Sequence, residues 1–440
     1  MKKDMRKKVG VISLGCDKNR VDTEKMLFLL SERYRLTQEI GEADIVVVNT
    51  CAFLNASRKE AIDEILALAR RKEEGKIEKL VVTGCLPQKF VKDLWKALPE
   101  ADVFAGISDY EKLPAAIEES YRSGRLNIVG APRGEPDCPR VRTTENYAYL
   151  KIADGCSNFC TYCLIPKIRG AYRSVPEEQL LREARGLGHV KELILVAQDV
   201  TKYGADLGGG ENLVRLIGKL SALENVEKIR LLYCYPESVS EELIDEIASN
   251  GKVLKYIDIP LQHADDGVLK RMNRKGTYES NLALVRKLKA RVPGIAVRST
   301  FIAGFPGESE AAFSRLCDFL REAELFNAGF FAYSKEPDTA AARLKDQIPA
   351  RVKAARVKKL YAVQKEIAAK LLAEMKGKVL DVCVDSFEGV CWAGRVYCNA
   401  PAVDGAVYFT GAGDFGAGDT VRVRVTGYED YDLYGVFEKK

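Results

Sequence analysis

Short apolar runs rich in Val and Ile recur three times between residues 8 and 130, as KVGVISLGC, ADIVVVNTC and EKLVVTGC. Continuous runs of this kind predict strands that are buried on both faces of a parallel sheet. The stretches 21–34 and 56–75 follow the first two runs and have the spacing of helices. The alternation of strands and helices predicts a doubly wound α/β domain over residues 8–130.

Each of these three runs ends in a cysteine, at Cys16, Cys51 and Cys85. The carboxyl ends of parallel strands meet along one edge of a sheet, where sites form, so we expect the three cysteines to converge. Any one of them alone is explained by packing, since free cysteine is often buried. The shared strand-end position in all three favours a common ligand instead.

A second α/β region begins at Tyr147, after the segment 131–146, which is rich in Pro, Arg and Thr and is predicted to be a linker. Six apolar runs predict strands, with helical segments between them. They are YAYLKIADGC, ELILVAQD, KIRLLYCY, KYIDIPLQ, AVRSTFIAGF and NAGFFAYS. Six strands with helical crossovers predict an open (βα)6 barrel over residues 142–372.

The end of the chain has a different pattern. A basic helical segment at 348–376 is followed by short alternating strands separated by Gly- and Asp-rich turns. This pattern predicts a small closed β-barrel over residues 375–440. Residues 376–440 contain seven Lys and Arg against ten Asp and Glu, a net charge of −3.

Composition narrows the class of protein. The chain of 440 residues is 47% hydrophobic, long enough for two or three domains, and carries a net charge of only +5. The opening segment has no apolar stretch that resembles a signal peptide, and no run approaches the ~20 apolar residues of a membrane helix. We therefore expect a cytoplasmic protein without a membrane partner, in which the twelve cysteines stay reduced. With only two histidines, a histidine-rich zinc site is nearly excluded.

The segment GCSNFCTYC places Cys156, Cys160 and Cys163 in a CxxxCxxC pattern after a predicted strand. A 4Fe–4S cluster normally takes four thiolates, so three would leave one iron open for catalysis. S-adenosylmethionine can bind such an iron through its amino and carboxylate groups. A structural zinc site would need a fourth Cys or His nearby. Apart from the three cysteines themselves, the only such residue between Cys138 and Cys234 is His189. Electron-transfer clusters more often show CxxCxxC spacing with a distant fourth cysteine.

With Tyr162 before its last cysteine, this segment resembles the signature of the radical SAM superfamily, and FIAGFPGE at 301–308 resembles its Gly-rich strand. Over residues 8–440 the chain resembles the methylthiotransferase family, with an N-terminal cluster domain, a radical SAM barrel and a TRAM barrel. SLGCDKNRVDTE is closer to the group that modifies ribosomal protein uS12 than to the tRNA-modifying groups. LLYCYPE, KYIDIPLQHA, NAPAVDGAVYF and YEDYDLYG also resemble that group. Asp17 and Val175 depart from it, where Pro and Arg are common.

This resemblance implies a transferase that adds a methylthio group to the β-carbon of an aspartate of uS12. It implies two 4Fe–4S clusters, S-adenosylmethionine, an external electron donor, a sulfur donor and a monomeric enzyme. The metal ligands would be Cys16, Cys51, Cys85, Cys156, Cys160 and Cys163. One S-adenosylmethionine would methylate a sulfur, and another would yield the radical that opens the C–H bond. The acidic barrel favours a basic protein substrate. A tRNA adenosine methylthiotransferase and an iron–sulfur electron carrier remain as alternatives.

Residues besides the cysteines are candidates for contact with the cofactor. We predict this role for Tyr162, Gln198, Arg298 and Gly304, because each lies in or beside one of the two motifs or at the end of a strand. Gln262 and His263, Asp199, Ser299 and Thr300 are weaker candidates, and for His263 a structural hydrogen bond is an equal alternative. The remaining cysteines are predicted to be packing residues. They are Cys138, Cys234, Cys317, Cys383, Cys391 and Cys398.

Overall fold

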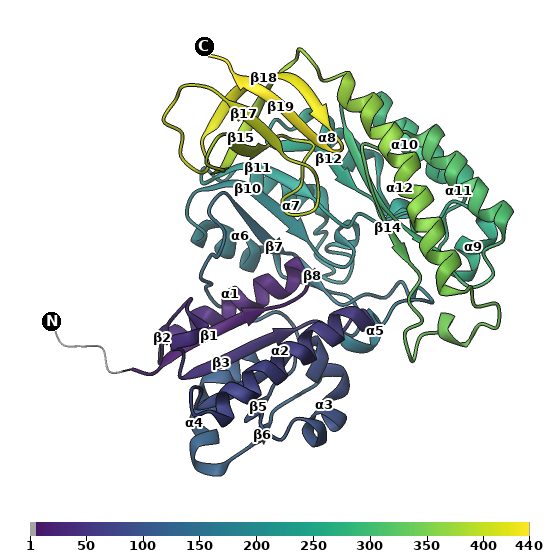
Figure 1. The fold of residues 1–440 in the computed structure, drawn as a ribbon. Coiled ribbons are helices and arrows are strands. Elements are labelled where there is room, and N and C mark those ends of the chain that lie inside the picture. Colours follow the sequence, from purple (N-terminus) through teal and green to yellow (C-terminus); the bar gives the residue numbers. More distant parts are fainter. Residues whose placement is uncertain (1–5, 440) are drawn as a thin grey trace.

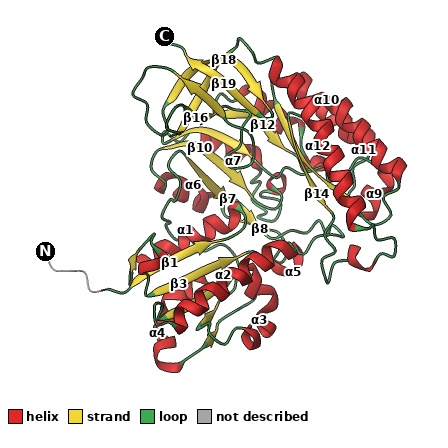
Figure 2. Ribbon diagram, in the orientation of Figure 1, coloured by secondary structure: helices red, strands yellow, loops and turns green. Residues whose placement is uncertain are grey.

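The computed structural model describes residues 6–439, which form an N-terminal α/β layer, an open parallel sheet and a small closed barrel. Figure 1 shows the layer (purple) and the barrel (yellow) at opposite ends of the molecule, with the open sheet between them, and Figure 2 shows helices packed on both larger sheets. Residues 1–5 and 440 lie outside the described part. The prediction that the chain opens without a signal peptide concerns residues 1–5 in part, and the predicted barrel at 375–440 ends at residue 440, so these parts of both predictions lie outside the described residues. Within residues 6–439, no helix combines the length and the apolar character needed to cross a membrane.

The first sheet has six parallel strands in the order β2-β1-β3-β4-β5-β6. The strands are β1 Lys8–Ser13, β2 Arg35–Leu36, β3 Ile45–Thr50, β4 Lys79–Gly84, β5 Val103–Phe104 and β6 Leu126–Asn127. The helices are α1 Asp17–Ser31, α2 Asn55–Glu73, α3 Cys85–Ala97 and α4 Leu113–Ser123. Helices α2 and α3 pack with Val46 and Val82 on one face, and α1 and α4 pack with Val47 and Val81 on the other. This arrangement confirms the doubly wound prediction.

The second sheet also has six parallel strands, in the order β7-β10-β11-β12-β13-β14. The strands are β7 Tyr147–Lys151, β10 Val190–Val196, β11 Val226–Leu231, β12 Val253–Asp258, β13 Ala296–Ala303 and β14 Asn327–Ala332. The helices are α6 Glu177–Gly186, α7 Leu213–Ser221, α8 Glu241–Ser249, α10 Tyr278–Arg291, α11 Glu310–Ala323 and α12 Ala350–Ala373. Strands β7 and β14 are the two edges, so the sheet is an open (βα)6 barrel, as predicted.

Short elements complete the loops of this barrel. They are α5 Ile165–Ile168, α9 Asp266–Arg271, β8 Ala153–Asp154 and β9 Arg173–Ser174, with the 3-10 turns η3 Val200–Lys202, η4 Pro236–Ser238 and η5 Ala341–Arg343. The N-terminal layer has two further 3-10 turns, η1 Ile40–Glu42 and η2 Tyr110–Lys112. Strands β8 and β9 pair antiparallel and close the base of the loop that carries the CxxxCxxC cysteines. That loop is therefore anchored at both ends.

The C-terminal strands form a closed barrel in the order β15-β16-β17-β19-β18, as predicted. They are β15 Val379–Phe387, β16 Trp392–Arg395, β17 Val407–Thr410, β18 Thr420–Glu429 and β19 Asp432–Phe437. The barrel core shares one apolar cluster with Ile194 and Val196 of β10 and with Val21 of α1. The alternate residues of β10, Leu193 and Leu195, belong to the other apolar cluster, which includes the surrounding helices. Because side chains alternate along a strand, α1 and the small barrel both pack on the inner face of the open sheet.

The segment 131–146 contains no helix or strand, as a linker predicts, but the side chain of Glu135 within it is buried. The carboxylate of Glu135 lies 3.0 Å from the ammonium of Lys25 in α1 and 2.7 Å from that of Lys151 in β7, and all three side chains are at most 5% exposed. Burial alone would raise the pKa of Glu135, but the two lysines outweigh it and lower the pKa to about 2. The segment is thus an ionic seam between the N-terminal layer and the open barrel.

We expect Glu135→Gln to melt at a lower temperature than the wild type at pH 7, because it removes the shared anion from two buried lysines. Breaking a buried ion pair typically costs about 3–5 kcal/mol. The folded carboxyl has a lower pKa than the unfolded one, whose ordinary value is 4.5. Its contribution to stability is therefore complete above pH 4.5 and is lost as the pH falls from about 4.5 to about 2.

Thermal unfolding followed by circular dichroism checks this expectation, and the two melting curves should converge over that pH interval. Glu178→Gln is the control, since the Glu178 side chain is 91% exposed and its partner Arg182 lies at 4.0 Å. The control should melt like the wild type. Equal melting of Glu135→Gln and the wild type at pH 7 would mean that the seam contributes no stability.

Candidate cluster-binding site

The three cysteines of the CxxxCxxC segment lie in the loop between β8 and α5. The amide of Cys156 donates to the carbonyl of Gly170 at 3.1 Å, and the amide of Cys163 donates to that of Cys160 at 3.0 Å. Gly155 has φ +77°, and a Cβ atom there would lie 2.1 Å from the Ala171 carbonyl oxygen, so this turn requires glycine. The backbone thus fixes where the three thiols are presented.

Burial opposes ionisation of the Cys156 and Cys163 thiols by raising their pKa. Burial raises the pKa of the Cys163 thiol to about 12, and the neighbouring Cys160 and Cys156 add to the rise. The amide of Ile165 opposes it by donating to the Cys163 sulfur at 3.4 Å. A thiol must lose its proton to bind iron. The positive charge of a bound metal would stabilise the thiolate form that burial disfavours here.

The structure also brings together Cys16, Cys51 and Cys85. Cys16 is the residue before α1, Cys51 follows β3, and Cys85 is the first residue of α3. The sulfurs of Cys16 and Cys85 each lie 3.9 Å from the side-chain oxygen of Asn19. A Cβ atom on Gly15 would lie 3.3 Å from the sulfur of Cys51. The strand-end pattern therefore does produce convergence at one sheet edge.

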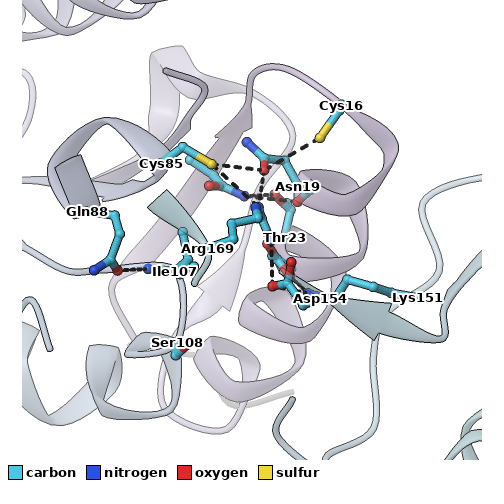
Figure 3. A network of polar contacts seen from close by, with 12 residues as sticks. Cys16, Asn19, Thr23, Cys85, Gln88, Ile107, Ser108, Lys151, Asp154 and Arg169 are labelled. Carbon is cyan, nitrogen blue, oxygen red and sulfur yellow. Dashed lines mark hydrogen bonds and ion pairs between the residues drawn. The ribbon is translucent and has the colours of Figure 1, made fainter. Parts of the chain in front are cut away.

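Asn19 holds the centre of this first triplet. Its side-chain nitrogen donates to the carbonyls of Leu14 at 3.0 Å and Thr50 at 3.1 Å, so its oxygen must face the cysteines. Arg169 reaches the same point from the other domain and donates to the Cys85 sulfur at 3.6 Å (Figure 3). Sequence reasoning missed both residues. The signal for Asn19 was its position three residues after Cys16, inside the opening motif.

The donor set of each triplet fits an iron–sulfur cluster, with three thiols and no imidazole. Within the described residues 6–439, no three His, Cys, Asp or Glu side chains gather closely enough to hold a single metal ion. A cubic cluster takes one thiolate at each iron corner, so its cysteine sulfurs stand further apart than the ligands of one ion.

One loop of the open barrel faces both triplets. Tyr233 and Tyr235 follow β11 and flank the buried Cys234. The hydroxyl of Tyr233 donates to the Asp17 carboxylate, next to Cys16, at 3.0 Å. The hydroxyl of Tyr235 lies 3.7 Å from the sulfur of Cys160. The two triplets therefore share a wall. The sequence analysis did not predict a role for Tyr233 and Tyr235. The signal was present in the motif LLYCYPE, where two tyrosines flank a buried cysteine at a strand end.

Two of the predicted cofactor residues lie beside the CxxxCxxC loop. Tyr162 packs in an apolar cluster with Phe305 and Tyr333. Gln198 donates to the Asp154 carboxylate at 3.0 Å, while its side-chain oxygen is buried and has no partner. A buried acceptor without a partner is a place where a ligand's amino group or hydroxyl would bind. The cofactor role of both residues stays a prediction.

The other two predicted cofactor residues have protein partners. Arg298 donates to Asp258 at 3.0 Å and to Asp404 of the small barrel at 3.2 Å, so it ties the two barrels together. Gly304 has φ +72°, and a Cβ atom there would lie 2.4 Å from Cγ of Lys353 in α12. The aliphatic part of the Lys353 side chain therefore packs against Gly304. Cofactor binding by these two also stays a prediction.

The weaker candidates fall into structural positions. His263 is fully buried, accepts from the Asp265 amide at 2.9 Å and contacts Glu308 at 3.2 Å. Since Nδ1 accepts, Nε2 carries the proton and donates to Glu308. Asp199 is buried and accepts from Asn158 in the CxxxCxxC loop at 3.0 Å. Ser299 accepts the amide of Leu261. Cys234, Cys317 and Cys398 are buried, as packing predicts, while Cys138, Cys383 and Cys391 are half-buried.

Comparisons with known proteins cover all three parts of the chain. The Radical SAM superfamily matches residues 150–320, the uncharacterized protein family UPF0004 matches residues 8–106, and the TRAM domain matches residues 377–437. The ribosomal protein uS12 methylthiotransferase RimO of Clostridium tetani is 44% identical over 98% of both chains. That of Geotalea uraniireducens is 45% identical over 99% of both chains. The chain belongs to the RimO family.

Solved structures support the fold of this RimO family member. The radical SAM methyltransferase TsrM from Kitasatospora setae has a TM-score of 0.54 at 12% identity, over 86% of this chain and 77% of that one. The cobalamin-dependent enzyme OxsB has a TM-score of 0.53 at 15% identity, over 72% of this chain and 52% of that one. At such identities the likeness concerns the fold alone. The family membership makes this chain a radical SAM transferase, whose superfamily implies S-adenosylmethionine and a 4Fe–4S cluster.

Proposed function

We propose that this protein adds a methylthio group to the β-carbon of an aspartate in ribosomal protein uS12. The observation that carries the proposal is the shared wall between two cysteine triplets, formed by Tyr233 and Tyr235. Its relatives in Clostridium tetani and Geotalea uraniireducens are ribosomal protein uS12 methylthiotransferases, which supports this substrate. Sulfur insertion at an unactivated carbon needs a radical generator and a sulfur carrier side by side, and two facing clusters supply both.

The second cluster and its ligands are part of this proposal. We assign one 4Fe–4S cluster to Cys156, Cys160 and Cys163, and a second to Cys16, Cys51 and Cys85. The proposed domain boundaries are 8–130, 142–372 and 375–440, and the matched family regions fall inside them. An external electron donor, a sulfur donor, a cytoplasmic location and a monomeric state belong to the same proposal.

When bound, these cofactors supply the radical that removes a hydrogen atom and the methylated sulfur that replaces it. The chain's own residues hold the reacting groups and keep out water. Gln198 offers its unpartnered oxygen toward the amino group or a hydroxyl of S-adenosylmethionine, and Tyr162 packs beside it. Tyr233 reaches Asp17 beside the first triplet and Tyr235 reaches Cys160 in the second, so the two rings border both triplets.

The small barrel supports a basic protein as the substrate. Its net charge of −3 disfavours the phosphate backbone of RNA. Tyr408 and Tyr434 stack on its outer face with ring centroids 5.8 Å apart, and Tyr434 is 39% exposed. Glu429 and Asp432 border the Tyr434 side chain. Aromatic faces edged by carboxylates bind Arg and Lys side chains, which ribosomal proteins carry in excess.

We expect the reconstituted enzyme to modify uS12 and to leave tRNA unchanged. The test offers uS12 and bulk tRNA in separate reactions with S-adenosylmethionine, a reductant and sulfide, and measures both by mass spectrometry. A uS12 variant with alanine in place of the modified aspartate is the control and should gain no mass. A gain on tRNA with none on uS12 would mean that the chain is a tRNA adenosine methylthiotransferase. Formation of neither product nor 5′-deoxyadenosine would leave only the electron-carrier alternative.

A further inference from the structure

We propose that Arg169 tunes the N-terminal cluster by donating a hydrogen bond to the Cys85 thiolate from the neighbouring domain, which raises that cluster's reduction potential. The proposal rests on the proposed function, which assigns a cluster to Cys16, Cys51 and Cys85. Arg169 belongs to the other triplet's loop, six positions after Cys163, just beyond α5. It is therefore a positioning residue that acts across the domain boundary.

The contacts of Arg169 point one edge of its guanidinium at the first triplet. One terminal nitrogen lies 3.6 Å from the Cys85 sulfur, 2.7 Å from the Asn19 side-chain oxygen and 3.2 Å from Asp22. The other donates to Asp154 at 2.8 Å. Figure 3 shows the side chain running from Asp154 to the space between Asn19 and Cys85. The acidic partners thus hold the guanidinium in place, and the nitrogen that contacts Asn19 and Asp22 also reaches the Cys85 thiol.

Burial makes this contact strong. Arg169 is only 1% exposed, so water does not compete for its donors and the local dielectric constant is low. A hydrogen bond from this buried guanidinium to the Cys85 sulfur therefore keeps its strength at the boundary between the two domains.

Hydrogen bonds to cluster sulfurs and the net charge near a cluster are two of the terms that set its reduction potential. A donor to a thiolate withdraws electron density, and a nearby cation favours the reduced, more negative form. Both effects of Arg169 have the same sign. A purely structural ion pair with Asp22 and Asp154 would predict a loss of stability on substitution but no shift in potential.

The test uses the full-length chain with Cys156, Cys160 and Cys163 replaced by alanine, so that only the N-terminal cluster is present. Iron and sulfide are determined first, and the midpoint potential is then measured by EPR of samples poised at defined potentials. Arg169→Gln should give a more negative potential than the parent. Arg169→Lys keeps the charge and should shift the potential in the same direction by less.

Lys167→Gln is the matched control, because it removes the same charge two positions away. Lys167 is exposed and donates to the backbone carbonyl of Asp338 at 2.7 Å. Its potential should equal that of the parent. If Arg169→Gln does not fold, Arg169→Lys, which keeps a cation for Asp154, decides the question.

An unchanged potential in the Arg169 variants, with one cluster bound per chain, would overturn the role of Arg169 and leave the two-cluster proposal intact. An equal shift in Lys167→Gln would also overturn it, because the effect would then be general charge rather than a directed hydrogen bond. A parent chain that binds no iron would instead overturn the assignment of a cluster to the first triplet, and the role of Arg169 with it.

Discussion

Cys156→Ala is expected to abolish the formation of 5′-deoxyadenosine from S-adenosylmethionine. Cys156 is the first of three cysteines on one short loop, and no other thiol of that triplet replaces it. Its side chain lies outside the apolar core clusters, and its backbone bond to Gly170 survives the substitution, so the chain should fold. With two ligands left, the cluster would be lost.

The measurement is chromatography of 5′-deoxyadenosine after incubation with S-adenosylmethionine and dithionite, together with iron analysis. Iron content should fall to about half, because the first triplet keeps its cluster. Cys391→Ala is the matched control, since Cys391 is a half-buried cysteine of the small barrel, and it should behave like the wild type. Continued formation of 5′-deoxyadenosine by Cys156→Ala would place radical generation elsewhere.

The fold and the positions of the six cysteines were predictable because they depend on local pattern. Buried parallel strands read as continuous apolar runs, and their carboxyl ends share an edge whatever the details of packing. Because β1, β3 and β4 are neighbouring parallel strands, Cys16, Cys51 and Cys85 meet at one edge of the sheet.

Residues that act across the domain boundary could not be predicted. Arg169 and Asn19 are 150 positions apart, and their contact depends on how α5 docks against α1. Composition predicted a linker at 131–146 but gave no sign of the buried ion pairs within it. Glu135 is buried there because its partners, Lys25 and Lys151, come from two different domains. The pairing of distant charges leaves no periodic signal in a single sequence.

The second large effect is expected at Cys51. Cys51→Ala should abolish methylthio transfer to uS12 while leaving some cleavage of S-adenosylmethionine. Cys51 is the member of the first triplet that follows β3 directly, and it lies against Gly15. Strand β3 belongs to a different sheet from the strands around the CxxxCxxC loop. Loss of its cluster would remove the sulfur carrier without removing the radical source.

The reaction is followed by mass spectrometry of uS12 and by chromatography of 5′-deoxyadenosine in the same samples. Cleavage without product is the signature that separates this variant from Cys156→Ala, which should show neither. Cys138→Ala, at another half-buried cysteine beside the same domain, controls for the loss of a thiol. If Cys51→Ala still made methylthiolated uS12, the sulfur would have to reach the carbon radical without the first triplet. The convergence of Cys16, Cys51 and Cys85 would then be a matter of packing at the sheet edge.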